Sequence, residues 1–381
     1  MDKLQNIIAE GKTQRLVSID ALRGFDMFWI IGGARLFGII FTLRQVPWMA
    51  RVALEFEHSI WHGFTFYDLV FPLFLFIVGL AIPFSLSKYS RDADIFKNSA
   101  AYGYIRIIIR TITLLVLGFI VNGLLDFNFS SMRWPGVLQR IAICYLFAAV
   151  ILMLTKGRRQ ALIIGIIIII IVAGYWAIMR FVPVPGGVAG DLSQEGNLAG
   201  YIDRAIIPGS FCCYGYGDNE GLLTTLPSIA STLIGVMAGL LLKTGKSHNY
   251  KLKWLSIAGA GSFAAGFLWN IVFPVNKILW TSSYVLFSGG LSLLLFVFFY
   301  WLIDVKGYKK WAFFFTVIGM NAITIYVIQA IFDFGIITDI FLHGFVGRLG
   351  IVKDIFYMVC FIAVKWLFLY FLYKKKIFLK A

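Results

Sequence analysis

Two of the four histidines in this 381-residue chain, His58 and His62, stand four residues apart just before an apolar run. The stretch reads EFEHSIWHGFTFYDLVFPLFLFIVG over residues 55–79, and Asp68 lies between the histidines and the run. A neutral histidine can accept a proton near neutral pH, because its reference pKa is about 6.5. If a helix begins early, the spacing of four puts both histidines on one face. The residue types therefore permit proton transfer, a metal site or a purely interfacial hydrogen bond.

A metal site is disfavoured. No further His, Cys or carboxylate at ligand spacing completes a set, and the H-E-x-x-H pattern does not occur. The sequence also contains no Walker loop, no G-x-S-x-G elbow and no dinucleotide fingerprint. The four cysteines lack zinc or redox spacing. Because a bridge between the neighbours Cys212 and Cys213 would be strained, we interpret all four as small packing residues.

The composition is that of a membrane protein. Hydrophobic residues make up 60% of the chain and charged residues 14%, against about 25% charged in soluble domains. Apolar runs of about 20 residues, enough to cross a bilayer, recur along the chain, and each must be helical to satisfy its backbone in lipid. The sequence predicts one integral membrane domain over residues 1–381, an all-α bundle of about ten transmembrane helices near 25–42, 64–86, 105–125, 137–155, 161–182, 223–242, 254–273, 279–303, 311–333 and 354–373.

The basic residues predict the orientation of this bundle. With ten spans both termini share one side, and most of the 34 Lys and Arg residues lie there, which marks that side as cytoplasmic. It holds the N-terminal segment 1–22, which has no signal-peptide pattern, and the basic tail 374–381. The loop 183–222 contains five acidic residues and one arginine, and is predicted to face outward. Topology thus explains the net charge of +15, and no nucleic-acid partner is expected.

Polar side chains inside the predicted spans are few, and the cost of placing them in lipid makes them functional candidates. Asp68 and Arg140 both fall near the outer face. We expect them to share a polar pocket there; the alternative, which is compatible with a pocket, is that they pair to neutralise each other between helices. Lys365, in the last span, is expected to extend its ammonium to the interface. The outer face also collects other polar residues, namely His58, His62, Asp126, Asp203, Arg204 and Asn270.

Seven sequence blocks, in order from residue 15 to about 330, together resemble the heparan-alpha-glucosaminide N-acetyltransferase-like family of membrane proteins. The blocks are RLVSIDALRGFDMF (15–28), HSIWHGFTFYDLVFPLFLFIVG (58–79), RWPGVLQRIAICYL (133–146), GYIDRAIIPG (200–209), DNEGLLTTLPSIASTLIGVMAG (218–239), NKILWTSSYVL (276–286) and DVKGYKKWAFFFTVIGMNAITIYV (304–327). The resemblance implies a bundle of ten or eleven helices. Such a bundle takes acetyl-CoA from the cytoplasm and delivers acetyl to an amino sugar on the other side.

The resemblance implies a role for His58, and the types and positions of other residues suggest roles for them. The active-site histidine of the family lies in an H-x-x-W-x-G motif, which HSIWHG matches with His58 and Trp61, whereas His62 fills a variable position. His58 is predicted to act as a general base or as a nucleophile that carries the acetyl group, with Asp68 orienting it or the sugar. The predicted acceptor-binding residues are Arg140, Asn270, Asp203 and Trp61. Those predicted to hold acetyl-CoA, through its phosphates or beside them, are Arg23, Asp20, Arg15 and Asn321. Arg106 and Arg110 are further candidates for the phosphates, although topology explains them equally well.

Two other functions remain open. A transporter also suits ten spans with charged residues at depth, although no internal repeat is visible and the polar residues crowd the outer half. A glycan O-acyltransferase would use the same donor and differ only in its acceptor. For the acetyltransferase, the sequence does not identify which amino sugar is the acceptor. The basic loops suggest a bacterial inner membrane, and the relatives suggest a homodimer in the lipid bilayer.

Overall fold

A computed structural model of the chain describes residues 16–43, 46–91 and 99–379. These described parts consist of helices and loops; they contain two isolated β-bridges and no β-strand. The α-helices are α2 (Val17–Phe28), α3 (Ala34–Thr42), α4 (Pro47–Leu54), α5 (Val70–Arg91), α6 (Ser99–Val121), α7 (Val137–Leu154), α8 (Gln160–Phe181), α9 (Leu198–Ile206), α10 (Leu222–Lys243), α11 (His248–Trp269), α12 (Ser282–Phe299), α13 (Phe313–Met320), α14 (Ala322–Ile331), α15 (Phe334–Val346) and α16 (Lys353–Lys374). Short 3-10 or π segments are η1 (Trp29–Gly33), η2 (Phe66–Leu69), η3 (Leu124–Asp126), η4 (Tyr300–Val305) and η5 (Gly350–Val352).

Eight helical segments within the described residues are long and apolar enough to cross a membrane. The bent pair α13 and α14, which meet at 67°, makes a ninth if it is one span. This confirms the predicted polytopic helical bundle. The predicted count of ten also included 254–273, which corresponds to α11; that helix is long enough but begins with His248, Lys251 and Lys253 and is less apolar than the others. Which side each terminus faces stays a prediction.

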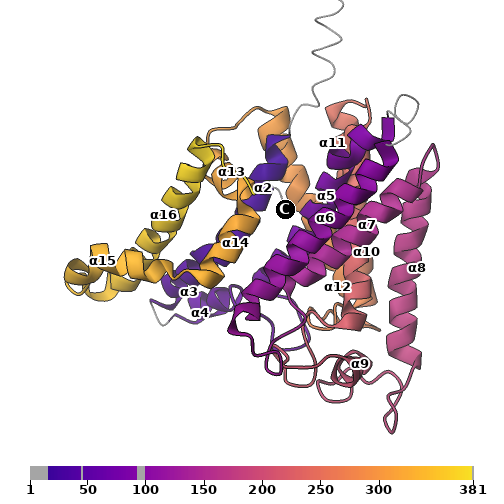
Figure 1. Cartoon of the computed structure of the whole chain (residues 1–381), viewed down its shortest axis with the longest axis horizontal. Helices are drawn as coiled ribbons and strands as arrows, with labels where there is room; N and C mark the ends of the chain where they lie inside the picture. The colour runs from indigo at the N-terminus through magenta and orange to yellow at the C-terminus, as the bar shows by residue number, and fades with distance from the viewer. Residues whose placement is uncertain (1–15, 44–45, 92–98, 380–381) are drawn as a thin grey trace, which may run out of the picture.

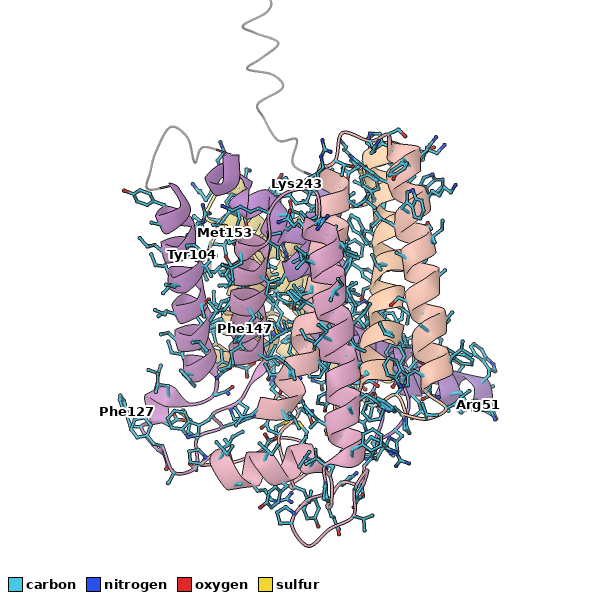
Figure 2. The ribbon with its side chains drawn as sticks, turned by 90° about the vertical axis from the view of Figure 1, so that its right-hand side faces the viewer. Arg51, Tyr104, Phe127, Phe147, Met153 and Lys243 are labelled. Atoms are coloured by element: carbon cyan, nitrogen blue, oxygen red, sulfur yellow. A yellow bond between two sulfur atoms is a disulfide. The ribbon has the colours of Figure 1, made fainter. Side chains whose placement is uncertain are left out.

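The helices form two adjoining groups (Figure 1). The first contains α2, α3, α13, α14 and α16, and the second contains α5 to α8 with α10 to α12. Contacts of α2 with α5 and α12, and of α14 with α6, join the groups. The long helices run roughly parallel, with Lys243 near one end of the molecule and Phe127 and Arg51 near the other (Figure 2).

Close helix packing requires small residues at the contact between α5 and α10. A Cβ added at Gly235 would overlap the Phe76 carbonyl oxygen, and one at Gly239 would crowd the Leu80 carbonyl oxygen. Both glycines therefore allow the two helices to pack closely. The buried core around this contact extends through most of the described helices.

The first span is broken at η1, where Gly32 has a φ of 146° that favours glycine. Lys365 of α16 donates one hydrogen bond to the Ile31 carbonyl oxygen at 3.0 Å and another to Gln329 Oε1 at 3.1 Å. Its ammonium also lies 4.1 Å from the Phe361 ring centroid. The prediction that Lys365 extends to the interface is therefore wrong, because the carbonyl at the break offers it a buried partner.

Candidate active site

His58 lies on the loop between α4 and η2, so it does not share a helix face with His62 as predicted. The loop ends at a capping box, in which the Thr65 N–H donates to Asp68 Oδ2 at 3.1 Å and the Asp68 N–H donates back to Thr65. Tyr284 of α12 donates from its hydroxyl to the Asp68 backbone oxygen at 2.7 Å. The start of the second span is thus tied to α12, which fixes the position of the Asp68 carboxylate.

His58 and Asp68 form a hydrogen-bonded pair. His58 Nδ1 lies 2.8 Å from Asp68 Oδ1, and the Ser59 N–H donates to Oδ2 at 3.2 Å. The Asp68 side chain is fully buried, whereas the His58 side chain is half exposed. Because Nδ1 faces a carboxylate, we assign the ring proton to Nδ1, which leaves a lone pair on Nε2. A histidine oriented in this way is able to accept a proton or attack a carbonyl carbon.

Lys277, which was not among the predicted site residues, is a third member of this group. Its Nζ lies 2.8 Å from His58 Nδ1 and 3.0 Å from Nε2, and 3.5 Å from Asp68 Oδ1. Burial lowers the pKa of Lys277, although the charge of Asp68 acts in the opposite direction. The loop that carries it is held to the His58 loop by the Gly63 N–H, which donates to the Val275 oxygen at 2.9 Å.

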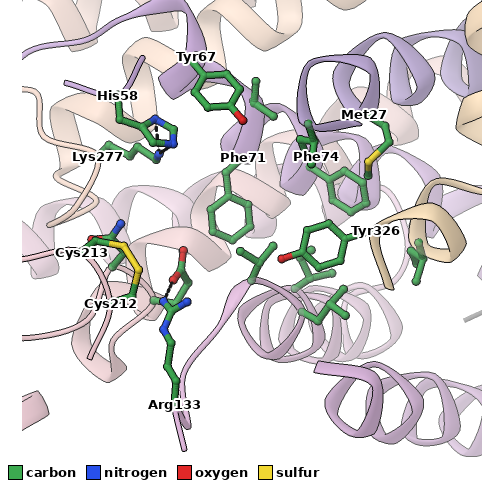
Figure 3. Close-up of a pocket in the computed structure, with 18 residues that line it drawn as sticks. Met27, His58, Tyr67, Phe71, Phe74, Arg133, Cys212, Cys213, Lys277 and Tyr326 are labelled. Atoms are coloured by element: carbon green, nitrogen blue, oxygen red, sulfur yellow. Dashed lines mark hydrogen bonds and ion pairs between the residues drawn. A yellow bond between two sulfur atoms is a disulfide. The ribbon is translucent and has the colours of Figure 1, made fainter. Parts of the chain in front are cut away.

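His58 and Lys277 line a cavity of about 270 Å³, which we call the His58 cavity (Figure 3). Figure 3 shows them together on one wall, with the Cys212–Cys213 disulfide and Arg133 nearby. Tyr67, Phe71, Phe74, Met27 and Tyr326 provide an apolar wall. The Tyr67 ring stacks on the His58 ring, with 4.6 Å between centroids. The cavity therefore joins one reactive polar corner to an apolar slot.

A second cavity of about 560 Å³, the arginine cavity, is lined by Arg23, Arg106 and Arg110. It shares Phe74 and Ile323 with the lining of the His58 cavity. Arg110 places its guanidinium 4.4 Å from the Tyr145 ring centroid, and its Nε is buried without a hydrogen-bond partner. The two cavities therefore adjoin at Phe74, with residues 67–74 lining the His58 cavity and residues 74–85 contributing to the arginine cavity.

Arg133 organises the polar edge of the His58 cavity. It donates from Nε and Nη2 to the two oxygens of Asp218 at 2.8 and 2.6 Å, and from Nη2 to Glu220. Burial opposes ionisation of both Arg133 and Asp218. The hydrogen bonds and opposite charges prevail, so the pKa of Arg133 is raised and that of Asp218 is lowered. Asn219, between the two acids, has a buried Oδ1 without a partner and also lines the cavity.

The Arg133–Asp218 pair predicts a pH-dependent stability. The pKa of Asp218 is below its usual 3.8 in the folded protein, so the pair stabilises the fold above about pH 3.8 and loses this contribution as the pH falls further. We expect Asp218→Asn to lower the free energy of unfolding by about 3 kcal/mol at neutral pH and by much less in acid. Apparent unfolding temperatures in detergent measure this. Glu57→Gln, on the exposed Glu57 side chain, is the control, and an equal loss in both variants contradicts the prediction.

Cys212 and Cys213 are joined by a disulfide, so their interpretation as packing thiols is wrong. The Cys212 N–H donates to Asp218 Oδ2 at 2.9 Å, and the backbones of Cys213 and Asp218 form an isolated antiparallel β-bridge. Both cysteines line the His58 cavity. The adjacent pair is accommodated because Cys213 takes a φ of 87°. The contacts with Asp218 therefore hold the backbone of the two disulfide-bonded cysteines in place.

Thiol alkylation tests the disulfide. We expect two cysteines, Cys144 and Cys360, to be alkylated when the protein is denatured without reductant. All four cysteines of the sequence should react after reduction. Peptide mass spectrometry identifies which cysteines react, and alkylation of all four without reductant contradicts the bridge.

Arg140 lies behind the His58 cavity and does not pair with Asp68. It is almost fully buried and donates to Thr224 Oγ1, with the Gly221 oxygen 3.5 Å away. Its guanidinium lies over the Trp280 ring, 4.9 Å from the centroid, and its Nε and Nη1 have no partner. Arg140 therefore supports the start of α10 beside the cavity.

The other predicted acceptor-binding residues shape the loops around the site. Asp203 accepts from the Leu222 N–H at 2.9 Å and the Asp218 N–H at 3.1 Å, and so caps α10. Trp61 donates from Nε1 to the Leu192 oxygen at 2.8 Å. Asn270 accepts from the Val275 N–H at 2.7 Å and forms the turn that leads to Lys277. The lining of the His58 cavity contains none of these three residues.

The residues predicted to hold acetyl-CoA differ in where they lie relative to the arginine cavity. Arg23 lines the arginine cavity and pairs with Asp20 at 3.4 Å. Asn321 lies at the bend between α13 and α14, where it donates to the Ile377 oxygen at 3.2 Å. Its neighbours Met320 and Ala322 line the cavity. Arg15 lies outside the described residues.

The fold and site define a polytopic helical membrane protein with a histidine–carboxylate pair where an internal cavity meets one end of the bundle. Residues 15–194 match the family described as Domain of unknown function (DUF5009). The chain is 29% identical to heparan-alpha-glucosaminide N-acetyltransferase of Homo sapiens, over 84% of this chain and 53% of that protein. With the protein of the same name from Mus musculus it shares 30% identity, over 71% of this chain and 48% of that protein.

These matches confirm the resemblance predicted from the seven sequence blocks. Over most of its length the chain is similar to heparan-alpha-glucosaminide N-acetyltransferase. It spans about half the length of the two curated relatives that it matches.

Proposed function

We propose that the protein is a transmembrane acetyltransferase that moves acetyl from acetyl-CoA to the amine of an amino sugar. The proposal rests on two adjoining cavities that share Phe74 and Ile323, one lined by arginines and the other lined by His58, which pairs with Asp68 behind it. The names of the two relatives support the same reaction. We further propose that the arginine end faces the cytoplasm of a bacterium and the His58 end faces outward.

The arginine cavity suits the donor. Guanidinium groups bind phosphate oxygens through several hydrogen bonds at once, and Arg23, Arg106 and Arg110 line this cavity together. A long, thin pantetheine arm would then pass Phe74 and Ile323, which places the thioester in the apolar slot next to His58. The disulfide at the other end supports the outward orientation, because such bonds persist in oxidising compartments.

The polar edge of the His58 cavity suits the acceptor. Arg133, Asn219 and Glu220 offer donors and acceptors to sugar hydroxyls, and the partnerless Asn219 Oδ1 needs such a donor. In this arrangement the acceptor amine lies near His58, with its ring against the loop 212–220. We therefore assign the acceptor contacts to these residues, since Arg140, Asp203, Trp61 and Asn270 do not line the cavity.

The chemistry follows from the orientation of His58. Nε2 takes a proton from the acceptor amine as its nitrogen attacks the thioester carbonyl carbon. The C–S bond breaks, the coenzyme leaves as a thiolate, and the proton passes from His58 to the sulfur. Asp68 accepts from Nδ1–H throughout and stabilises the transient imidazolium. In a second route, Nε2 attacks the carbonyl first and the acetyl-imidazole then transfers its acetyl to the amine.

The test is acetyl transfer from radiolabelled acetyl-CoA to glucosamine by the purified protein in detergent. Labelled N-acetylglucosamine is the expected product. If the protein binds acetyl-CoA and leaves glucosamine unlabelled, the acceptor is wrong; label on a hydroxyl of a glycan would favour the O-acyltransferase. If it binds no acetyl-CoA, the two adjoining cavities favour a transporter instead.

Arg110 gives a prediction specific to the donor. We expect Arg110→Gln to raise the KM for acetyl-CoA about tenfold, because one charge-assisted hydrogen bond contributes about 1.5 kcal/mol, with kcat nearly unchanged. Steady-state kinetics at saturating glucosamine measures both constants. Arg158, exposed on the loop between α7 and α8, supplies the control Arg158→Gln. An equal KM in all three proteins contradicts a phosphate-binding role.

A further inference from the structure

Lys277 places a primary amine where the acceptor amine must react. Its Nζ lies 3.0 Å from His58 Nε2, the atom that takes the proton in the proposed reaction. The side chain is only 12% exposed to solvent, yet it lines the His58 cavity. Any acceptor amine that reaches His58 must therefore displace this ammonium or approach beside it.

The environment of Lys277 also favours its reactivity as an amine. Only the neutral amine is a nucleophile, and burial lowers the pKa of Lys277 so that the neutral form is reached more readily. The group beside it is a histidine with a free lone pair, able to take the remaining proton. The charged groups within reach are Asp68 at 3.5 Å and, through longer-range interactions, Glu220 and Arg140.

We propose that Lys277 is acetylated by the protein's own donor when acetyl-CoA is bound and no acceptor fills the His58 cavity. This inference rests on the proposed acetyltransferase function. Nζ forms a bond to the thioester carbonyl carbon, the C–S bond breaks, and the coenzyme leaves as a thiolate. The Nζ proton passes through His58 Nε2 to the sulfur, so the products are N-acetyllysine and free coenzyme A.

The product is an amide, which is far less reactive than a thioester, so the acetyl group stays on Lys277. Acetylation removes the positive charge that faces Asp68 and places a bulkier group beside His58. Protein that has been incubated with acetyl-CoA alone is then expected to transfer acetyl more slowly once an acceptor is added, and the rate should fall with the time of incubation. An acceptor in the cavity protects Lys277, because it occupies the same position and consumes the donor.

The experiment incubates wild-type protein in detergent with isotopically labelled acetyl-CoA and no glucosamine, and follows each lysine by peptide mass spectrometry. Lys251 of α11 is the internal comparison, since burial lowers its pKa too but it lines neither cavity. We expect Lys277 to gain acetyl about a hundredfold faster than Lys251. Glucosamine should slow the labelling of Lys277, and His58→Ala should reduce it to the rate of Lys251.

Lys277→Arg keeps a cation and should remove the fast label from the protein, with its apparent unfolding temperature as the check on folding. Equal labelling of Lys277 and Lys251 indicates non-enzymatic acetylation and overturns the inference. Label on His58 with none on Lys277 overturns it in favour of the acetyl-imidazole. If glucosamine is acetylated and Lys277 is not, the inference fails alone; if neither is labelled, the proposed function fails with it.

Discussion

Replacement of His58 by alanine is expected to lower the rate of acetyl transfer to glucosamine about 10³-fold or more. General-base catalysis contributes about 10² to 10⁴ to such rates, and the loss is larger if the imidazole itself carries the acetyl group. Alanine also leaves the buried Asp68 carboxylate with Lys277 as its remaining charged partner. The measurement is the initial rate at saturating concentrations of both substrates, with acetyl-CoA binding measured in parallel.

The matched control is His62→Ala, only four residues away on the same loop. His62 receives a hydrogen bond of 3.3 Å from Asn276, and partial burial lowers its pKa, but it lies outside the lining of the His58 cavity. We expect this variant to transfer acetyl at close to the wild-type rate. If folded His58→Ala protein that still binds acetyl-CoA transfers acetyl normally, the central role of His58 is lost. Acid-quenched protein that carries labelled acetyl on His58 selects the covalent route.

Most of the fold could be predicted because the signal is local. An apolar run of about 20 residues in lipid has no alternative to a helix, and its limits follow from its flanking charges. The breaks were not predictable in the same way. The first span opens at Gly32 and is held by Lys365, which is more than 300 residues away in the sequence. Asn321, at the bend between α13 and α14, donates to the Ile377 oxygen, which likewise comes from a distant segment.

In the site, too, local features could be predicted from the sequence and contacts between distant segments could not. His58 and Asp68 were found because a motif holds them ten residues apart, and the capping box with Thr65 fixes the carboxylate locally. Lys277 was not predicted, since only the folded turn after α11 brings it beside His58. The signal that could have identified it was its place in the family-like block NKILWTSSYVL. Arg133 also stands in such a block, but its partner Asp218 is 85 residues away.

Asp68→Asn is expected to lower the rate of acetyl transfer roughly 10² to 10⁴-fold while the protein still folds, because the carboxylate and not merely a hydrogen-bond acceptor is required. The side-chain oxygen of asparagine can still accept from the Ser59 and Thr65 N–H groups, which donate to Asp68 Oδ2 in the wild type. The negative charge is lost, however. The protonated His58 and the nearby Lys277 ammonium are then without their anion, so the imidazolium that forms during transfer is no longer stabilised.

Thr65→Ala separates this electrostatic role from the capping role of Asp68. It removes the hydroxyl that lies 3.1 Å from Asp68 Oδ2 and leaves both the carboxylate and the backbone hydrogen bonds. We expect it to cost about 1 kcal/mol in the free energy of unfolding and to retain most of the transfer rate. Initial rates and unfolding temperatures of Asp68→Asn and Thr65→Ala, measured side by side, separate the electrostatic role of Asp68 from its capping role. Equal losses of rate in both would mean that Asp68 acts only through the helix start, and His58 would then need another group to orient it.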